Sequence, residues 1–364
     1  MSLLHQIALT CIPEVGDVTA RSLLSYCGNP EEVFNTKKAH LRKIPGIGPK
    51  TADQIANPIA FRRAERELDF IDKHKIKPCF ITDVIYPKRL RNCSDAPILL
   101  YFKGEADFNG GKVISIVGTR NATNYGKDLC KQLIADLKIH QPLVVSGLAY
   151  GIDSMAHKEC LKNNISTIGV LGHGLDRIYP VQNKSLAEQM LNGGGLLTEF
   201  ISETIPGREN FPKRNRIIAG MTDATIVVEA SAKGGALITA EIANSYNRDV
   251  FAFPGKVTDE YSAGCNYLIK THRANLISKA SDVEYLLGWA NSSVQHVKPQ
   301  LSLMLDLSPD EKQVVDVLHE KGAVAVDELS VLCQLTQSKL AVTILGLEIR
   351  GYVIALPGKI YKLA

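Results

Sequence analysis

The chain contains six nearly continuous apolar runs, each about the length of a β-strand, and most of them end in glycine. A strand with no polar face is buried on both sides, so a sheet of such strands needs helices on each of its faces. The runs alternate with helical segments, which predicts an α/β fold with a doubly wound, extended Rossmann-like and mostly parallel sheet. The six runs are VISIVG (113–118), PLVVSG (142–147), TIGVLG (167–172), GLLTEF (195–200), ATIVVEA (224–230) and DVFAFPG (249–255).

Residues 1–66 predict a small all-α domain built on an internal repeat. The segment IPEVGDVTA (12–20) recurs as IPGIGPKTA (44–52), which implies two short helical hairpins. The second copy resembles a helix-hairpin-helix element, in which glycines let backbone amides approach a nucleic-acid phosphate. The first copy has Glu14 in place of a glycine, so we expect it to be structural. A packing-only role for both copies stays open, because such a turn also simply joins helices. The expected secondary DNA contacts are Gly46, Gly48 and Lys50.

Two further domains are expected after this one. The sheet domain is predicted over residues 70–288, and a linker over 289–307. Residues 308–364 predict three helices and a hairpin, which is the order of a winged helix. Residues 302–364 carry six basic against eight acidic side chains, and this balance argues against binding in a DNA groove. We therefore expect this domain to dock a partner or to be accessory, in preference to DNA contact.

Basic side chains gather in residues 205–220, where four lysines and arginines outnumber one glutamate by three. Pro212 suits the first turn of a helix there. Cations at that end of a helix add to the free amides and the helix dipole, which already favour anions. Phe211 beside them can stack on a base. Two alternatives stay open: Phe211 as a core residue, and Asn215 and Arg216 as buried braces at the edge of the sheet.

Ligands of a parallel sheet gather at the carboxyl ends of its strands, and most of the unusual residues of this chain lie just past such ends. A rim of cations over a floor of amides from Gly118, Gly147, Gly172 and Gly235 would form one groove for an anion. Stacking on an aromatic side chain of this groove would favour unpaired bases over duplex. The predicted contacts are Gly118, Thr119, Arg120, Gly147, Gly172, Tyr179, Phe211, Lys213, Arg214, Asn215, Arg216, Lys233, Gly234 and Gly235.

The sequence predicts neither a cofactor nor a metal. The turn GTRNATNYG (118–126) is not the Gly-x-Gly-x-x-Gly fingerprint, and the next strand ends without the acidic residue that binds a ribose. A nicotinamide cofactor is disfavoured accordingly. The chain has no Gly-x-x-x-x-Gly-Lys-Ser/Thr loop, which disfavours ATP hydrolysis. The eight cysteines form no close pair, and this spacing favours free thiols in a reducing compartment over disulfides or zinc.

The distribution of apolar and charged residues limits the kinds of partner that the chain is expected to bind. No apolar run reaches about twenty residues, and no basic leader precedes an apolar stretch, so we expect a soluble, cytoplasmic protein with no membrane partner. The net charge of +4 is uneven, because residues 37–66 carry a surplus of six positive charges. Such a basic region suggests an anionic polymer as partner, although a merely solvated basic face is the alternative.

Six motifs stand in a fixed order along the chain: VGTRNATNYG, VSGLAYGIDSMAHKECL, GVLGHGLDRIYP, LLTEF, FPKRNRIIAG and GGALITAEIA. In this order and spacing they resemble the DNA-processing protein A family, DprA, also called Smf. The resemblance spans about residues 70–288, and the terminal regions also fit family members. It implies a homodimer, formed through the α/β domain, that binds single-stranded DNA and shields it from nucleases and single-strand-binding protein. It also implies that the protein helps to load the RecA recombinase, chiefly in natural transformation. The DNA contacts that it implies are Arg120, Phe211, Lys213, Arg214 and Arg216.

Other functions compete with this interpretation. Ser146, Asp153 and His157 offer a nucleophile and a base, but the Gly-x-Ser-x-Gly elbow is missing, and an Asp-His pair four residues apart is more often a helix-start anchor. The segment KGGALITAE (233–241) is similar to the Pro-Gly-Gly-x-Gly-Thr-x-x-Glu motif of nucleoside-monophosphate phosphoribohydrolases. Glu241 keeps the glutamate, whereas Lys233 and Leu237 replace the proline and the third glycine, and the threonine is displaced to position 239. A transcription factor is disfavoured by the acidic winged helix. We therefore expect a protein that is not an enzyme.

Overall fold

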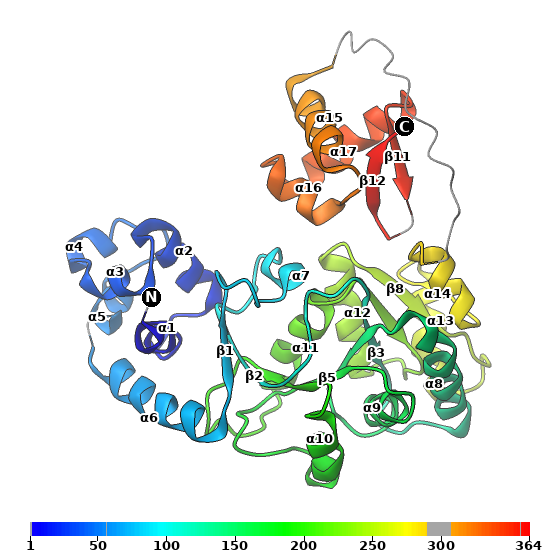
Figure 1. Cartoon of the computed structure of the whole chain (residues 1–364), viewed down its shortest axis with the longest axis horizontal. Helices are drawn as coiled ribbons and strands as arrows, with labels where there is room; N and C mark the ends of the chain where they lie inside the picture. Colours follow the sequence, from blue (N-terminus) through cyan, green and yellow to red (C-terminus); the bar gives the residue numbers. More distant parts are fainter. Residues whose placement is uncertain (1, 56, 290–306, 357) are drawn as a thin grey trace. The chain divides into compact units, whose positions relative to one another are not determined.

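The computed structural model describes residues 2–55, 57–289, 307–356 and 358–364. The chain forms two compact units, Met1–Leu276 and Ile277–Ala364, and Figure 1 labels the elements of both. Most of the linker expected over 289–307 lies outside the described residues.

Within the described residues, the first unit is organised around a nine-stranded sheet in the order β1-β2-β6-β5-β4-β3-β7-β8-β9. The six apolar runs form β3 to β8, so the predicted doubly wound α/β fold is confirmed. Neighbouring strands from β6 to β9 pair in parallel, and β2 and β1 add an antiparallel edge beyond β6. The strands are β1 Lys77–Phe80, β2 Leu99–Gly104, β3 Val113–Val117, β4 Leu143–Ser146, β5 Thr167–Val170, β6 Gly195–Thr198, β7 Ala224–Val227, β8 Asp249–Ala252 and β9 Asn275–Leu276.

Helices cover both faces of this sheet (Figure 1). The helices α8, α9 and α10 connect β3 to β6 on one face, and α11 and α12 lie on the other, as right-handed crossovers require. The order of strands reverses at β3, which lies between β4 and β7. Such a reversal opens a crevice at the carboxyl ends of the strands. The helices of this part are α7 Lys88–Arg91, α8 Asn124–Leu137, α9 Ile152–Lys162, α10 Lys184–Met190, α11 Asn210–Gly220, α12 Gly235–Ser245 and α13 Ala263–Lys270, with short 3₁₀ turns η1 Lys138–His140, η2 Val181–Asn183 and η3 Glu260–Ser262.

The internal repeat is visible in the backbone of the N-terminal helices. Glu14 and Gly46 occupy the same position in the two copies, and their φ angles are 65° and 84°. The helices that follow begin at equivalent positions, Asp17 and Pro49. The expected all-α region with two related hairpins is therefore confirmed. Its helices are α1 Leu3–Thr10, α2 Asp17–Cys27, α3 Pro30–Asn35, α4 Lys38–Leu41, α5 Pro49–Ile55 and α6 Ile59–His74.

The first hairpin is docked against the sheet domain. Asp17 accepts hydrogen bonds from the Ile98 amide (3.0 Å) and from the Arg216 guanidinium (2.9 Å). Arg21 of the same helix donates to the Cys93 carbonyl (2.5 Å). Buried residues of α1 and β2 also belong to one hydrophobic core. The helical region therefore cannot be removed without exposing apolar surface of the sheet domain.

The second unit holds a winged helix with its own hydrophobic core. Its small sheet has the order β10-β12-β11, and between Ser308 and the hairpin lie three helices, as the sequence predicts. Ser308 opens it with a capping box: its amide donates to Glu311 (2.8 Å), and its hydroxyl accepts from the Glu311 amide (3.4 Å). The elements are α14 Ala280–Leu286, α15 Pro309–Lys321, β10 Val324–Ala325, α16 Val326–Leu332, α17 Gln337–Ile349, β11 Val353–Leu356 and β12 Ile360–Leu363.

In the part of the chain that the structure describes, no single helix combines the length and the apolar composition that a bilayer span needs. Helices α16 and α17 reach that composition only as a pair, and a bend of 105° separates them.

The docking of the first hairpin generates a stability prediction. We expect Asp17→Ala to lower the free energy of unfolding by roughly 1–3 kcal/mol, because it removes hydrogen bonds to a backbone amide and to a mostly buried guanidinium. Chemical denaturation measures this difference. Asp69→Ala removes the same charge from an exposed position of α6 and is the matched control. Equal effects of the two substitutions would contradict a docking role for Asp17.

Candidate nucleic-acid interface

A cleft of about 660 Å³ opens where the strand order reverses, at the carboxyl ends of β3 and β7. Residues 117–120 after β3, the start of α11 and the first turns of α12 supply most of its wall. Nine of the predicted contacts line it, and they come from segments far apart in the sequence. They are Gly118, Thr119, Arg120, Tyr179, Phe211, Arg214, Asn215, Gly234 and Gly235.

A cation and two aromatic rings meet in this cleft. The guanidinium carbon of Arg120 lies 5.5 Å from the centre of the Phe211 ring, within the range of a cation–π contact. The Tyr179 ring lies on Phe211 as well, with 6.0 Å between the ring centres. Arg120 is exposed, Tyr179 is 46% exposed and Phe211 is half-buried. The cleft therefore offers a free cation beside aromatic surface, the combination that holds an unpaired nucleotide.

Arg214 lies beneath the cleft and is buried. Its guanidinium donates to the carbonyls of Gly147 (2.5 Å) and Val170, which are the ends of β4 and β5, and to the side chain of Asn215 (3.1 Å). Burial lowers the pKa of Arg214 to about 10, although Asp153 nearby opposes the shift. Arg214 thus stays cationic at neutral pH, and it makes the cleft positive while its Nε and Nη1 groups donate to the protein.

The glycines after β4 and β5 make room for side chains of α11. The Gly147 amide donates to Asp153 (3.2 Å), so it is no donor in the floor of the groove. A methyl group on Gly147 would overlap the Arg214 guanidinium, and one on Gly172 would press on the Phe211 ring at 3.2 Å. Both glycines are buried and leave space for the two side chains of α11. The predicted floor of amides is therefore wrong for Gly147.

The remaining predicted contacts lie outside the cleft wall. Lys213 and Lys233 are exposed at its borders in the sequence, next to residues that line it. Arg216 turns to the other side of α11, where it pairs with Asp17 (2.9 Å) and Glu199 and donates to the Asp95 carbonyl. Its side chain is only 11% exposed. Arg216 is thus the buried brace that the sequence left open, and we correct its assignment as a DNA contact.

The carboxylates of Asp17 and Glu199 share the single guanidinium of Arg216, and this crowding of negative charge contributes to a raised pKa of Glu199. One of its oxygens, Oε1, is buried and has no hydrogen-bond partner among the described residues. Burial raises the pKa of Glu199 to about 7, with Arg216 opposing the shift and Asp17 adding to it. Glu199 therefore titrates near neutral pH.

Sequence reasoning missed Arg208 as a residue of the cleft. Arg208 is exposed and lines the cleft ahead of α11. It belongs to the same basic stretch as Lys213 and Arg214, so its charge was the available signal. Nothing in its local pattern shows that the loop before α11 returns to the cleft.

The arrangement does not assemble the catalytic groups that the sequence offers. The Ser146 hydroxyl donates to the Ile116 carbonyl (2.6 Å), and His157 bonds through Nδ1 to Thr167 (2.7 Å). Burial lowers the pKa of His157 to about 3. Glu241 lies outside the cleft wall, is 57% exposed and pairs with Arg273 at 2.8 Å. Within the described ranges, no group of three or more His, Cys, Asp or Glu side chains is placed to hold a metal.

The second hairpin of the N-terminal domain presents the predicted secondary contacts to solvent. Gly46 has a positive φ of 84°, and no atom lies within 4 Å of a methyl group added at Gly48. The Lys50 side chain is 87% exposed, and its nearest carboxylate, that of Glu14, is 3.8 Å away. These three residues share one exposed turn.

Three family models match consecutive parts of the chain. Residues 77–288 match DNA recombination-mediator protein A, residues 7–57 match a SAM-like helix-hairpin-helix tandem, and residues 301–359 match the DprA winged helix domain. The first of these covers the sheet and the whole cleft.

Individual proteins give the same result. Protein Smf of Synechocystis is 32% identical over 98% of both chains, and DNA processing protein DprA of Streptococcus pneumoniae is 40% identical over 62% of this chain and 81% of its own. The X-ray structure of the Streptococcus pneumoniae protein superposes with a TM-score of 0.66, at 32% identity, over 78% of this chain and 97% of that one. The structure of DNA processing protein A from Helicobacter pylori superposes with a TM-score of 0.52, at 26% identity, over 57% of this chain and 94% of that one.

The fold and the cleft thus define a three-part protein of the recombination-mediator class. The chain belongs to the DprA/Smf family.

The raised pKa of Glu199 generates a prediction of pH dependence. A carboxyl group whose pKa is higher in the folded state adds stability below its unfolded pKa, and this contribution is lost as the pH rises through about 7. The free energy of unfolding of the parent should therefore fall, relative to that of Glu199→Gln, by up to about 3 kcal/mol between acidic and mildly alkaline pH. Urea unfolding across this pH range measures the difference, with the exposed Glu65→Gln as control. A difference that stays constant over this range would show that folding does not raise the pKa of Glu199.

Proposed function

We propose that this protein binds single-stranded DNA in the cleft, with little sequence preference and without catalysing a reaction. The observation that carries the proposal is the meeting of Arg120, Phe211 and Tyr179 at the switch point of the sheet. The guanidinium supplies a phosphate contact, and the rings supply faces on which unpaired bases stack. Duplex DNA hides those base faces, so single strands are the preferred ligand.

The relatives support this assignment. DNA processing protein A from Helicobacter pylori binds single-stranded DNA, and its structure shares the fold of this chain. The phosphate contacts in the proposal are Arg120 and Arg208, together with the exposed Lys213 and Lys233, which are neighbours in sequence of cleft-lining residues. Gly118, Thr119, Gly234 and Gly235 allow the backbone of the strand to come close. Arg214 contributes its charge from below.

We also propose the finer roles that the family implies. The protein protects incoming single strands in competition with single-strand-binding protein, and it hands them to the RecA recombinase during transformation or recombination. The name of the matching family, a recombination mediator, supports a role in recombination. A homodimer through the α/β domain fits the outer edge of the sheet, where β9 pairs only with β8 among the described residues and Leu276 is 52% exposed.

A second, weaker contact is proposed at the exposed hairpin of the N-terminal domain. Gly46, Gly48 and Lys50 share this turn, and residues 37–66 carry six surplus positive charges. Long-range attraction of the DNA backbone follows from that charge. We assign this turn to duplex or junction segments next to the bound single strand, because the hairpin itself offers no stacking surface among its three contact residues.

The cleft generates the main binding prediction. Arg120→Ala should weaken the binding of oligothymidylate at moderate salt by roughly ten- to a hundredfold, the size of a lost charge-assisted hydrogen bond. The slope of affinity against salt should fall by about 0.7, the value for one phosphate contact on a single strand. Fluorescence anisotropy over a series of salt concentrations gives both quantities.

Lys131→Ala is the charge-matched control, because Lys131 is exposed on α8 and does not line the cleft. Equal affinities of the Arg120→Ala and Lys131→Ala proteins would exclude this cleft as the DNA site.

A further inference from the structure

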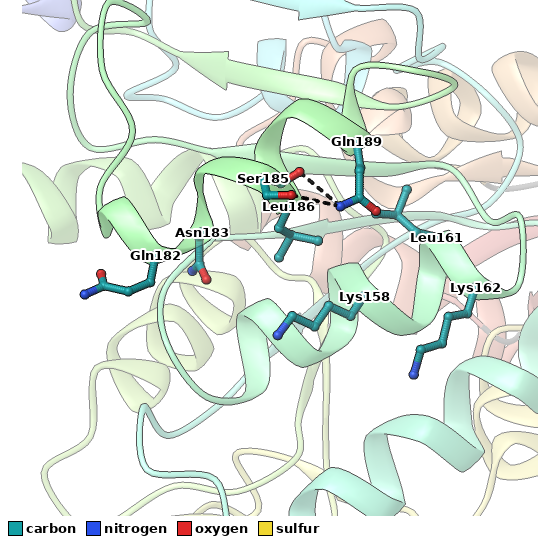
Figure 2. A pocket seen from close by; sticks show the side chains of 8 residues that line it. All are labelled: Lys158, Leu161, Lys162, Gln182, Asn183, Ser185, Leu186 and Gln189. Carbon is teal, nitrogen blue, oxygen red and sulfur yellow. Dashed lines mark hydrogen bonds between the residues drawn. The ribbon is translucent and has the colours of Figure 1, made fainter.

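A second hollow, of about 510 Å³, lies between α9 and α10 (Figure 2). Lys158 and Lys162 come from α9, whereas Gln189 comes from α10 and Gln182 from the η2 turn before it. Figure 2 shows the two lysines on one side of the hollow and the two glutamines on the other. Both charged residues of its lining are cationic, and none of the functions above uses them.

The polar groups of this hollow are partly available to a ligand. Lys158 is exposed and makes no hydrogen bond or ion pair within the described residues. Lys162 donates to Glu159 (2.6 Å), yet its side chain is 66% exposed. The amide nitrogen of Gln189 donates to Ser185 (3.2 Å) and leaves its oxygen unused. The hollow thus combines two cations with amide groups, which suits a phosphodiester backbone.

A side-chain hydrogen bond joins the wall of the hollow to a loop that also borders the cleft. The Tyr150 hydroxyl donates to the side-chain oxygen of Gln182, so the loop after β4 reaches the wall of the hollow. Ala149 of that loop lines the cleft. Tyr179 also lines the cleft and leads directly into η2. Tyr150 and Tyr179 are 42% and 46% exposed, so each site has an accessible tyrosine at or next to its wall.

We propose that the hollow between α9 and α10 binds the backbone of the single strand where it leaves the cleft. Lys158 and Lys162 contact successive phosphates, and Tyr150 and Tyr179 support the bases between the two sites. Lys158 lies six residues after the first residue of α9, about 9 Å along the helix, so a few nucleotides connect the cleft to it. The proposal rests on the proposed function and extends its site. The two accessible tyrosines favour DNA over an acidic protein segment.

The test compares two lengths of oligothymidylate on the full-length protein, about 6 and about 20 nucleotides, which lie below and above common single-strand site sizes. Lys158→Glu should weaken binding of the long strand about five- to tenfold and reduce its salt slope by about 0.7 or more. It should leave the short strand within twofold of the parent. Lys162→Gln, which still donates to Glu159, should give a smaller loss on the long strand only.

Lys131→Glu on α8 is the control with the same change of charge. A loss on the long strand no larger than that of the control, or an equal loss on both lengths, would overturn the proposal. Binding of polyglutamate that is lost in Lys158→Glu, with unchanged affinity for the long strand, would assign the hollow to an acidic protein segment instead. Arg120→Ala distinguishes a failure of this proposal from a failure of the proposed function. If Arg120→Ala weakens binding of the short strand while Lys158→Glu changes neither affinity, the cleft remains the DNA site and only its extension to the hollow is wrong. If Arg120→Ala leaves the affinity for the short strand unchanged, the cleft is not the DNA site and the proposed function itself is contradicted.

Discussion

Two arginines on α11 hold the site together. Arg214 and Arg216 are two residues apart and so point about 200° apart around the helix. Arg214 donates to the carbonyl ends of two strands, and Arg216 pairs with Asp17 and Glu199. Removing the partner of a buried charge is strongly destabilising, so each arginine holds its side of the helix in place. The position of α11 in turn decides where Phe211 meets the cleft.

This division separates two uses of positive charge in one basic segment. The guanidinium of Arg214 is buried, and its Nε and Nη1 groups donate to Asn215 and to backbone carbonyls, so it acts on a ligand mainly through its charge. Arg120 and Arg208 are exposed, and they come from loops that the sheet topology brings to the same place. A ligand in the cleft therefore meets the exposed side chains of Arg120 and Arg208 above the buried charge of Arg214. The buried charge attracts the phosphates, and the exposed side chains adapt to their spacing.

The duplicated hairpins of the N-terminal domain also differ in role: the first packs against the sheet domain, and the second is exposed to solvent. In the first copy, Asp17 and Arg21 build the contact with the sheet domain. The second copy keeps its glycine turn and Lys50 in solvent. Because Asp17 also pairs with Arg216, the helical domain is joined through one ion pair to the helix that carries Phe211. Changes at the N-terminal domain and at the cleft are thus physically connected.

The parallel sheet, the winged helix, the internal repeat and the crevice could all be predicted from the amino-acid sequence, because apolar runs, capping patterns and strand ends are local signals. The same signals predicted Arg120, Tyr179 and Phe211 as residues of the site, since each follows a strand or opens a helix. The different positions of Arg214 below the cleft, Arg216 on the far side and Arg208 in the wall emerge only when the chain is folded. All three have the same charge and lie within nine residues, and what separates them is the position of carbonyls and carboxylates from distant segments. Gly147 illustrates the same reason: its lack of a side chain is local, but the guanidinium that needs the space comes from 67 residues away.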